Sequence, residues 1–280
     1  MAKLLEGRPL ADKIKEEIKS QVASLKSQPV LCSILVGDDP SAVAYVKSQS
    51  KTAHSLGITY KLHQLDINIT EPALMDFILG LNADKTVNGI IVQTPLPAAI
   101  DYKLISECIS PLKDVEGIHP LNMGKLFFGQ ADMVACTAGA VMELLNSTNV
   151  DLSGKEVVIV GHSEIVGKPL MLLLLEKFAT VTVCHIGTSK AGKLQEHVQL
   201  AEVLIVAVGK AGLIKGEWVK QGAIVIDVGI NRVNGLIVGD VEFAVAQKRA
   251  SYITPVPGGV GPLTVSILMR NLLKAVKLQQ

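Results

Sequence analysis

One stretch of the chain, AYVKSQSKTAHSLGI at residues 44–58, places polar side chains together on one face of a predicted helix. At about 3.6 residues per turn, Tyr45, Gln49 and Thr52 share a stripe, whereas Lys47 and Lys51 lie roughly 200° and 240° around from Tyr45. An amide can align a bound ligand, but it cannot take up and release a proton as an amine does. The stripe therefore favours binding and orientation over acid–base catalysis.

A second pattern predicts a dinucleotide site. In KEVVIVGHSEIVGKPL, residues 155–170, Gly161 directly follows a strand-like run and Gly167 opens a predicted helix. This is the arrangement of the first turn of a Rossmann fold, where backbone amides at a helix N-terminus face a phosphate. Ser163 stands where the middle glycine of G-x-G-x-x-G would be, so the glycine pair alone fits a plain strand–helix turn equally well.

The end of the next predicted strand bears on the choice of cofactor. It reads CHI at residues 184–186, with no Asp or Glu to hold a ribose 2′-hydroxyl. This favours NADP and leaves NAD as the alternative. No arginine is nearby, and the candidate phosphate contacts are His162, Thr188, Ser189 and Lys190.

Strand-like and helix-like runs alternate along the chain and must position these residues. Continuous apolar runs at 30–37, 155–161, 203–209 and 222–229 are typical of buried parallel strands. The alternation predicts an α/β protein with mainly parallel sheets. A helix in CTAGAVMELLNST, residues 136–148, is expected to connect two α/β halves, and a last helix at 263–278 follows a loop rich in glycine and proline.

Composition excludes several classes of function. The 280 residues are 49% hydrophobic, and Lys plus Arg total 27 against 26 Asp plus Glu, which argues against a nucleic-acid partner. The N-terminus lacks an apolar core of signal-peptide length, and the most apolar run, 169–175, is too short to span a bilayer. We therefore expect a cytoplasmic protein without a membrane partner. The scattered cysteines and the lack of HExxH or CxxC motifs predict reduced thiols and no metal.

Seven motifs occur in a fixed order along the chain: GDDPS-x3-Y, GIIVQTPLP, KDVEGIHP, VGHSEIVGKP, DVGIN, GDV and PVPGGVGPLT. With these motifs the sequence resembles the methylenetetrahydrofolate dehydrogenase/methenyltetrahydrofolate cyclohydrolase family over essentially its whole length. The resemblance implies a folate-binding domain at 1–140, a Rossmann-type NAD(P)-binding domain at 141–262, and a C-terminal segment, 263–280, that packs back on the first domain. It also implies a homodimer formed through the second domain.

The resemblance implies roles for individual residues. Tyr45 would stack near the folate, Gln93 matches a glutamine that hydrogen-bonds a lysine of the family at the position of Gln49, and Glu116 matches an aspartate that binds the pterin ring. The other residues expected to contact the folate are Pro95, Leu96, Pro257, Gly258 and Gly259. Those expected to contact the cofactor are Gly161, His162, Ser163, Ile165, Val166, Gly167, Thr188 and Ile230.

The chain departs from the family pattern at the positions that matter most. Gln49 stands where the family has a catalytic lysine, Glu116 replaces the aspartate, and residues 135–138 read ACTA in place of PCTP. Hydride transfer needs mainly alignment and electrostatics, whereas hydration of the methenyl cation needs a group that changes protonation state. We therefore predict a dehydrogenase whose cyclohydrolase activity is weak or lost.

Three alternatives stay open at this point. The first is a fully bifunctional dehydrogenase/cyclohydrolase. The second is a catalytically disabled protein that binds folate or a nucleotide. The third is another two-domain dehydrogenase, acting on an amino acid or hydroxy acid, although the sequence shows no lysine–aspartate or histidine–carboxylate pair in a clear motif.

Overall fold

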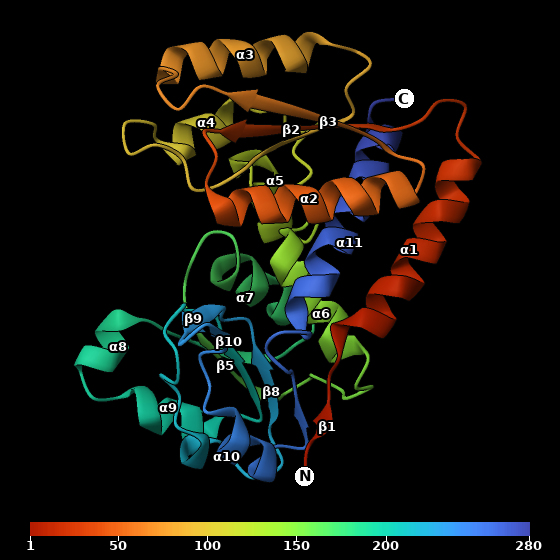
Figure 1. Ribbon diagram of the computed structural model, residues 1–280. Coiled ribbons are helices and arrows are strands. Elements are labelled where there is room, and N and C mark those ends of the chain that lie inside the picture. Colours follow the sequence, from red (N-terminus) through yellow and green to blue (C-terminus); the bar gives the residue numbers. More distant parts are fainter. The chain divides into compact units, whose positions relative to one another are not determined.

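A computed structural model describes residues 1–280 and has the predicted α/β class (Figure 1). The chain forms two compact units, one of Met1–Asp12 with Ala135–Thr264 and the other of Lys13–Val134 with Val265–Gln280. The domain boundary predicted after residue 140 stays a prediction. No helix combines the length and the apolar character that crossing a membrane requires.

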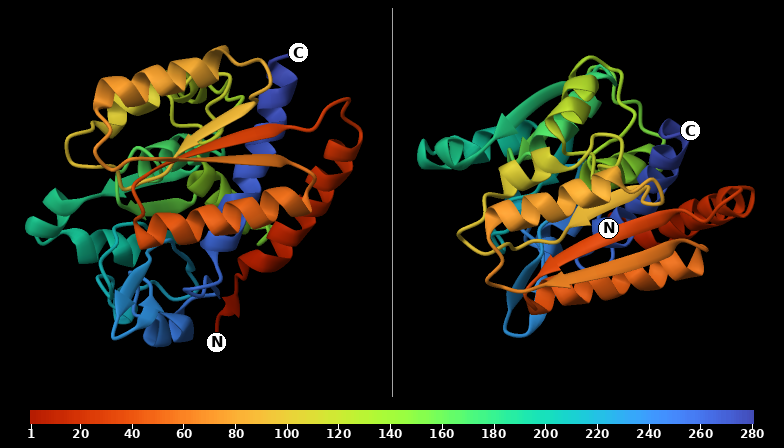
Figure 2. Two further views of the ribbon diagram at one scale, coloured as in Figure 1. Left: turned by 45° about the horizontal axis from the view of Figure 1, so that its top comes forward. Right: turned by 90° about the horizontal axis from the view of Figure 1, so that it is seen from above.

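The unit of Lys13–Val134 and Val265–Gln280 is built on a three-stranded parallel sheet of order β3-β2-β4. Its strands are β2 (Val30–Val36), β3 (Thr59–Leu65) and β4 (Gly89–Val92). The helices between and after them are α2 (Pro40–Ser55), α3 (Glu71–Ala83), α4 (Tyr102–Cys108) and α5 (Pro120–Phe127). Figure 2 shows α2 and α3 on opposite faces of this sheet.

Side chains alternate along the strands, so one face of the sheet packs against α3 and the other carries polar residues of the candidate site. Cys32, Ile34 and Val36 of β2 point to one face and pack with Leu74 and Ile78 of α3 in a hydrophobic cluster. Residues in register on neighbouring parallel strands share a face. Since Leu31 pairs with Tyr60 and with Gly89, the side chains of Ser33, Tyr60 and Gln93 belong to the opposite face.

The unit of Met1–Asp12 and Ala135–Thr264 contains a six-stranded parallel sheet of order β1-β11-β8-β7-β5-β6. Its strands are β1 (Lys3–Leu4), β5 (Glu156–Val160), β6 (Thr180–Cys184), β7 (Val203–Val206), β8 (Ile224–Asp227) and β11 (Tyr252–Ile253). The strand order reverses at β5, because β6 lies on one side of it and β7 on the other. Ligands of open α/β sheets bind at such a switch point.

Short helices and a hairpin complete this unit. The helices are α6 (Cys136–Asn146), α7 (Gly167–Leu175), α8 (Ile186–Lys190), α9 (Leu194–Leu200) and α10 (Phe243–Arg249), with a 3₁₀ turn at Gly216–Trp218. The antiparallel strands β9 (Asn231–Val233) and β10 (Leu236–Val238) form a separate two-stranded sheet. Two long helices, α1 (Gly7–Ala23) and α11 (Val260–Leu278), each contain residues of both units.

Candidate active site

Gln49 lies on the buried side of α2 and turns toward the sheet. The helix begins after Asp39, whose carboxylate accepts hydrogen bonds from the backbone N–H groups of Ser41 at 2.9 Å and Ala42 at 3.0 Å. Gln49 is completely buried. Its Oε1 accepts hydrogen bonds from the Tyr60 hydroxyl at 2.8 Å and from Gln93 Nε2 at 2.9 Å.

The hydrogen-bond network around Gln49 connects α2 to all three strands of the sheet. Gln93 Nε2 also donates to Ser33 Oγ at 2.9 Å, so the network joins β2, β3 and the residue after β4 to α2. Burial raises the pKa of Tyr60 to about 12, and its hydroxyl therefore stays a donor at any physiological pH. Gln49 Nε2, in contrast, is a buried donor without a hydrogen-bond partner. Such an atom costs roughly 1–3 kcal/mol of stability.

The other members of the predicted stripe lie nearer the surface. Tyr45 is 37% exposed, and Thr52 is half-buried. Lys47 and Lys51 are exposed, as their angles on the helix predict. Neither lysine has a contact with the Gln49 network, and no amine therefore replaces the missing one there.

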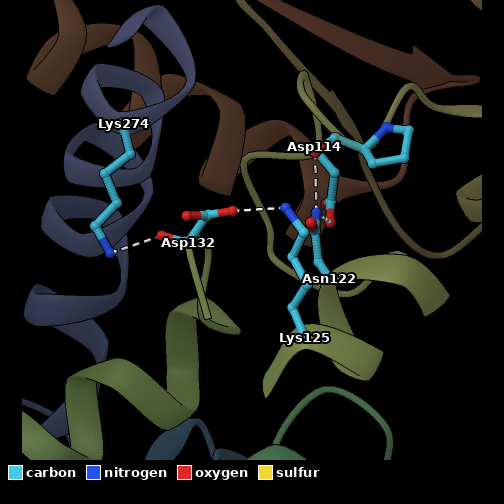
Figure 3. Close-up of polar contacts among 6 residues, drawn as sticks. Asp114, Asn122, Lys125, Asp132 and Lys274 are labelled. Carbon is cyan, nitrogen blue, oxygen red and sulfur yellow. Dashed lines mark hydrogen bonds and ion pairs between the residues drawn. The ribbon is translucent and has the colours of Figure 1, made fainter. Parts of the chain in front are cut away.

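Glu116 is carried by a turn that Asp114 organises. The Asp114 carboxylate, 2% exposed, accepts hydrogen bonds from the backbone N–H of Gly117 at 3.0 Å and of His119 at 2.8 Å. It also accepts one from Asn122 Nδ2 at 2.8 Å, which Figure 3 shows. Gly117 has φ +72°, a conformation that favours glycine. The first carboxylate of the KDVEG motif thus builds the turn that carries the second, Glu116.

The Glu116 side chain is half-buried, and its Oε2 accepts a hydrogen bond from the Tyr102 hydroxyl at 3.4 Å. Burial, assisted by the negative charge of Asp114, raises the pKa of Glu116 to about 8, while the hydrogen bond from Tyr102 acts in the opposite direction. Burial also raises the pKa of Asp114. Glu116 is therefore mostly protonated in the ligand-free protein at neutral pH.

The C-terminal helix holds the segments on either side of this turn, as the resemblance implied. Asn271 Nδ2 of α11 donates to the backbone oxygens of Val115 and Val134, both at 2.9 Å. Figure 3 shows a second connection, in which Lys274 Nζ donates to the Asp132 backbone oxygen at 2.9 Å and Lys125 Nζ to its carboxylate at 2.6 Å. The position of Glu116 is thus tied to residues near the end of the chain.

The turn between β5 and α7 requires glycine at both predicted positions. Gly161 has φ +123°, and a Cβ there would lie 2.3 Å from the backbone oxygen of Ala207. A Cβ on Gly167, where α7 begins, would lie 2.1 Å from the Gly161 oxygen. The two glycines let the turn pack closely against the chain's own backbone, and the turn sits at the switch point of the sheet, where ligands of open α/β sheets bind.

Most of the other predicted cofactor contacts lie at the surface, whereas Val166, directly before α7, is buried. Ser163 Oγ accepts from the Val166 backbone N–H at 3.2 Å, and Ile165 and Ile230 are 48% and 69% exposed. His185 caps the start of α8, where its Nδ1 accepts from the Gly187 N–H at 3.1 Å and Thr188 Oγ1 accepts from the His185 N–H at 3.2 Å. The His162 and His185 rings lie 5.1 Å apart. Ser189 and Lys190 are exposed.

The remaining predicted folate contacts lie in two loops. Pro95 and Leu96 follow β4, and Pro95 is exposed. In the PVPGG segment, the Gly258 oxygen accepts from the Gly7 N–H at 2.9 Å, and the Gly259 N–H donates to the Pro255 oxygen at 2.8 Å. These backbone contacts fix the loop ahead of α11.

Several residues of the site were not predicted. Ser33, Tyr60 and Tyr102 carry no motif signal, and only the structure reveals their contacts. Asp240 lies in the GDV motif, and its buried carboxylate accepts from the backbone N–H groups of Val208, Gly209 and Lys210 at 2.8, 3.0 and 2.7 Å. Asp240 therefore fixes the loop after β7, beside the switch point. Asp227, in contrast, belongs to the DVGIN motif that the sequence already singled out; it accepts from the N–H groups of residues 229, 240 and 241 and so fixes the loop after β8, and burial raises its pKa to about 6.

Comparisons with known proteins agree over the whole chain. Residues 5–116 match the model of the tetrahydrofolate dehydrogenase/cyclohydrolase catalytic domain, and residues 135–280 match that of its NAD(P)-binding domain. The chain is 48% identical to the bifunctional protein FolD of Bacillus subtilis, covering 99% of this chain and 98% of that protein.

Solved structures show the same similarity. The bifunctional enzyme FolD of Campylobacter jejuni is 46% identical, with a TM-score of 0.96 and 100% of both chains covered. The Trypanosoma brucei enzyme, solved with NADP and an inhibitor, is 40% identical, with a TM-score of 0.93 and coverage of 99% of this chain and 98% of that one.

Proposed function

The chain belongs to the tetrahydrofolate dehydrogenase/cyclohydrolase family, and from this premise we propose that it oxidises 5,10-methylenetetrahydrofolate to 5,10-methenyltetrahydrofolate and has little or no cyclohydrolase activity. The observation that carries the proposal is the buried Gln49 amide at the position of the family lysine. The Gln49 side chain, its partners Tyr60 and Gln93, and Ser33, which accepts from Gln93, are all neutral at physiological pH.

The oxidation requires mainly that the folate and the cofactor are aligned with each other. A folate nitrogen lone pair assists departure of a hydride from the methylene carbon, and NADP supplies the hydride acceptor when bound. No proton leaves that carbon, so no side chain has to act as a base. Tyr45 would support the folate, and the Glu116 carboxylate would accept hydrogen bonds from the pterin ring.

The cyclohydrolase step has a different demand. Water adds to the methenyl carbon and loses a proton, which leaves a hydroxyl on that carbon. The hydroxyl then loses its own proton to form the formyl C=O while the bond from that carbon to one ring nitrogen breaks, and that nitrogen gains a proton. A lysine amine can relay such protons, whereas the Gln49 amide cannot. The enzyme would therefore release methenyltetrahydrofolate instead of 10-formyltetrahydrofolate.

NADP is the cofactor we propose. The Gly161–Gly167 turn follows β5 at the switch point of the sheet, where backbone amides of this fold class meet a phosphate, and His185 follows β6 where an NAD site has a carboxylate. His162, Thr188, Ser189 and Lys190 are the side chains available to the 2′-phosphate. The related Trypanosoma brucei enzyme was solved with NADP.

One assay tests the proposed function. The purified chain is mixed with methylenetetrahydrofolate and NADP⁺, and in parallel with NAD⁺, while reduced cofactor and methenyltetrahydrofolate are followed together. We expect methenyltetrahydrofolate to accumulate in step with NADPH. Turnover of added methenyltetrahydrofolate well above its spontaneous rate would show a bifunctional enzyme instead. If neither cofactor is reduced, the chain is a folate- or nucleotide-binding protein.

A homodimer through the β9–β10 hairpin is the assembly we propose. Val233, Leu236 and Ile237 of the hairpin are 42%, 68% and 39% exposed, and a cavity of 510 Å³ lies among Val233, Leu236, Val238 and Phe243. Exposed apolar side chains grouped in this way are typical of protein interfaces. Sedimentation should give twice the 29.8 kDa chain mass. Leu236→Asp should give the monomer, while Leu200→Asp, on an exposed residue outside the hairpin, should not.

A further inference from the structure

Tyr102 and Glu116 form a pair that no motif of the chain predicted. Tyr102 is the first residue of α4, and its place is fixed from both sides. The Asp101 carboxylate accepts from the Lys103 N–H at 2.8 Å, and the Asp101 N–H donates to Glu71 Oε2 of α3 at 2.7 Å. These hydrogen bonds hold the start of α4 in place, and from there the Tyr102 hydroxyl donates to Glu116 Oε2 at 3.4 Å.

The surroundings of Glu116 oppose its ionisation. Asp114 of the same turn carries the nearest negative charge, and its own carboxylate is satisfied by Asn122 and two backbone N–H groups. His119 acts on Asp114 and not directly on Glu116. The Tyr102 hydroxyl is therefore the one neighbouring group that favours the charged carboxylate.

We propose that Tyr102 is a positioning residue that holds the ionised Glu116 carboxylate for the folate, so that binding of a folate releases a proton from Glu116 to solvent. The proposal rests on the proposed function, because it takes Glu116 as the group that meets the pterin ring. The ring N–H and amino groups of a pterin are donors, and an ionised carboxylate accepts from both, whereas a protonated one has an oxygen occupied by its proton.

The direction of the pH dependence follows from the raised pKa of Glu116, about 8. Below that pH the free protein holds the proton, and binding has to expel it, so affinity for a folate rises with pH until Glu116 is ionised. Because the Tyr102 hydroxyl lowers the pKa, its removal moves this rise to higher pH. A tyrosine with a merely structural role would change affinity equally at every pH.

Calorimetry of the full chain tests the proposal, with 5-formyltetrahydrofolate as a stable probe and two buffers of different ionisation enthalpy. At pH 7 the wild-type chain should release about 0.9 proton per bound folate, and Glu116→Gln should release none from this position. Tyr102→Phe should bind about fivefold more weakly than wild type at pH 8 and within about twofold of it at pH 9.5. Tyr252→Phe, the same change in β11, should match wild type throughout.

The outcomes separate this inference from the proposed function. Folate binding without proton release, or an equal loss of affinity at pH 8 and pH 9.5 in Tyr102→Phe, overturns the role of Tyr102 even if the chain reduces NADP⁺. Absence of both folate binding and NADP⁺ reduction overturns the proposed function and this inference together. Proton release with the shifted profile in Tyr102→Phe supports both.

Discussion

Gln49→Lys is expected to raise the rate of methenyltetrahydrofolate hydrolysis by at least about 100-fold, the lower range of what a positioned acid–base group contributes. The site offers acceptors for the amine of a lysine at position 49. Ser33 Oγ and the Tyr60 hydroxyl already belong to the network of Gln49 and Gln93, and rotation of the Gln93 amide would turn its oxygen toward the amine as a further acceptor. Burial disfavours the charged ammonium and so lowers its pKa toward neutrality, where it can exchange protons.

The comparison with Gln49→Met makes this result specific. Methionine has a similar length but no proton to exchange, so this variant should leave hydrolysis at the level of the wild-type chain. Both variants should keep the fold, as checked by circular dichroism. If Gln49→Lys is folded and no more active than wild type, the missing lysine does not explain the loss. The double variant Gln49→Lys/Glu116→Asp then shows whether the second departure from the family pattern contributes.

Much of the fold could be predicted because its signals are local. The strands of both sheets are continuous apolar runs, and the helices between them have clear apolar faces, so alternation alone indicated parallel α/β units. β1 was not predicted, because a strand of two residues, Lys3–Leu4, is too short to show a period. Its pairing with β11 also joins opposite ends of the chain, which no local pattern records.

The candidate site was predictable only where a motif marks it. In the family pattern Gln93 would hydrogen-bond the lysine that Gln49 replaces, and in this chain Gln93 and Gln49 are hydrogen-bonded to each other. The contributions of Ser33 and Tyr60 depend on the register of β2, β3 and β4, which decides that their side chains share a face. The sequence also could not predict that Gln49 Nε2 has no partner. Tyr60 and Gln93 both donate to Gln49 Oε1, so the orientation of the Gln49 amide leaves its Nε2 without an acceptor.

Tyr102 illustrates a further limit of sequence patterns. As the first residue of a seven-residue helix, it carries no periodic signal, and its importance comes from the carboxyl that a separate turn brings to it. The raised pKa of Glu116 likewise follows from burial and from Asp114, two consequences of the folded turn. Motifs locate such residues, but three-dimensional contacts determine their charge.

Asp240→Ala is expected to lower the free energy of unfolding of the unit that contains it by roughly 3–5 kcal/mol, because several buried donors lose their shared acceptor. The carboxylate is completely buried and accepts from the N–H groups of residues 208, 209 and 210 and from Asn231 Nδ2 at 2.9 Å. Removing it leaves the three backbone N–H groups without their acceptor and Asn231 Nδ2 with only the Val238 oxygen at 3.4 Å, and each unsatisfied donor carries a desolvation cost.

Urea unfolding followed by tryptophan fluorescence measures this effect in the relevant unit, because Trp218 is the only tryptophan and packs against its hydrophobic core. Asp240→Asn keeps the volume and one acceptor oxygen, so it should lie between wild type and Asp240→Ala. A loss below about 1 kcal/mol in the alanine variant would mean that water replaces the carboxylate. NADP⁺ affinity should fall with stability, since the loop at 208–210 follows β7 at the switch point where the dinucleotide is expected.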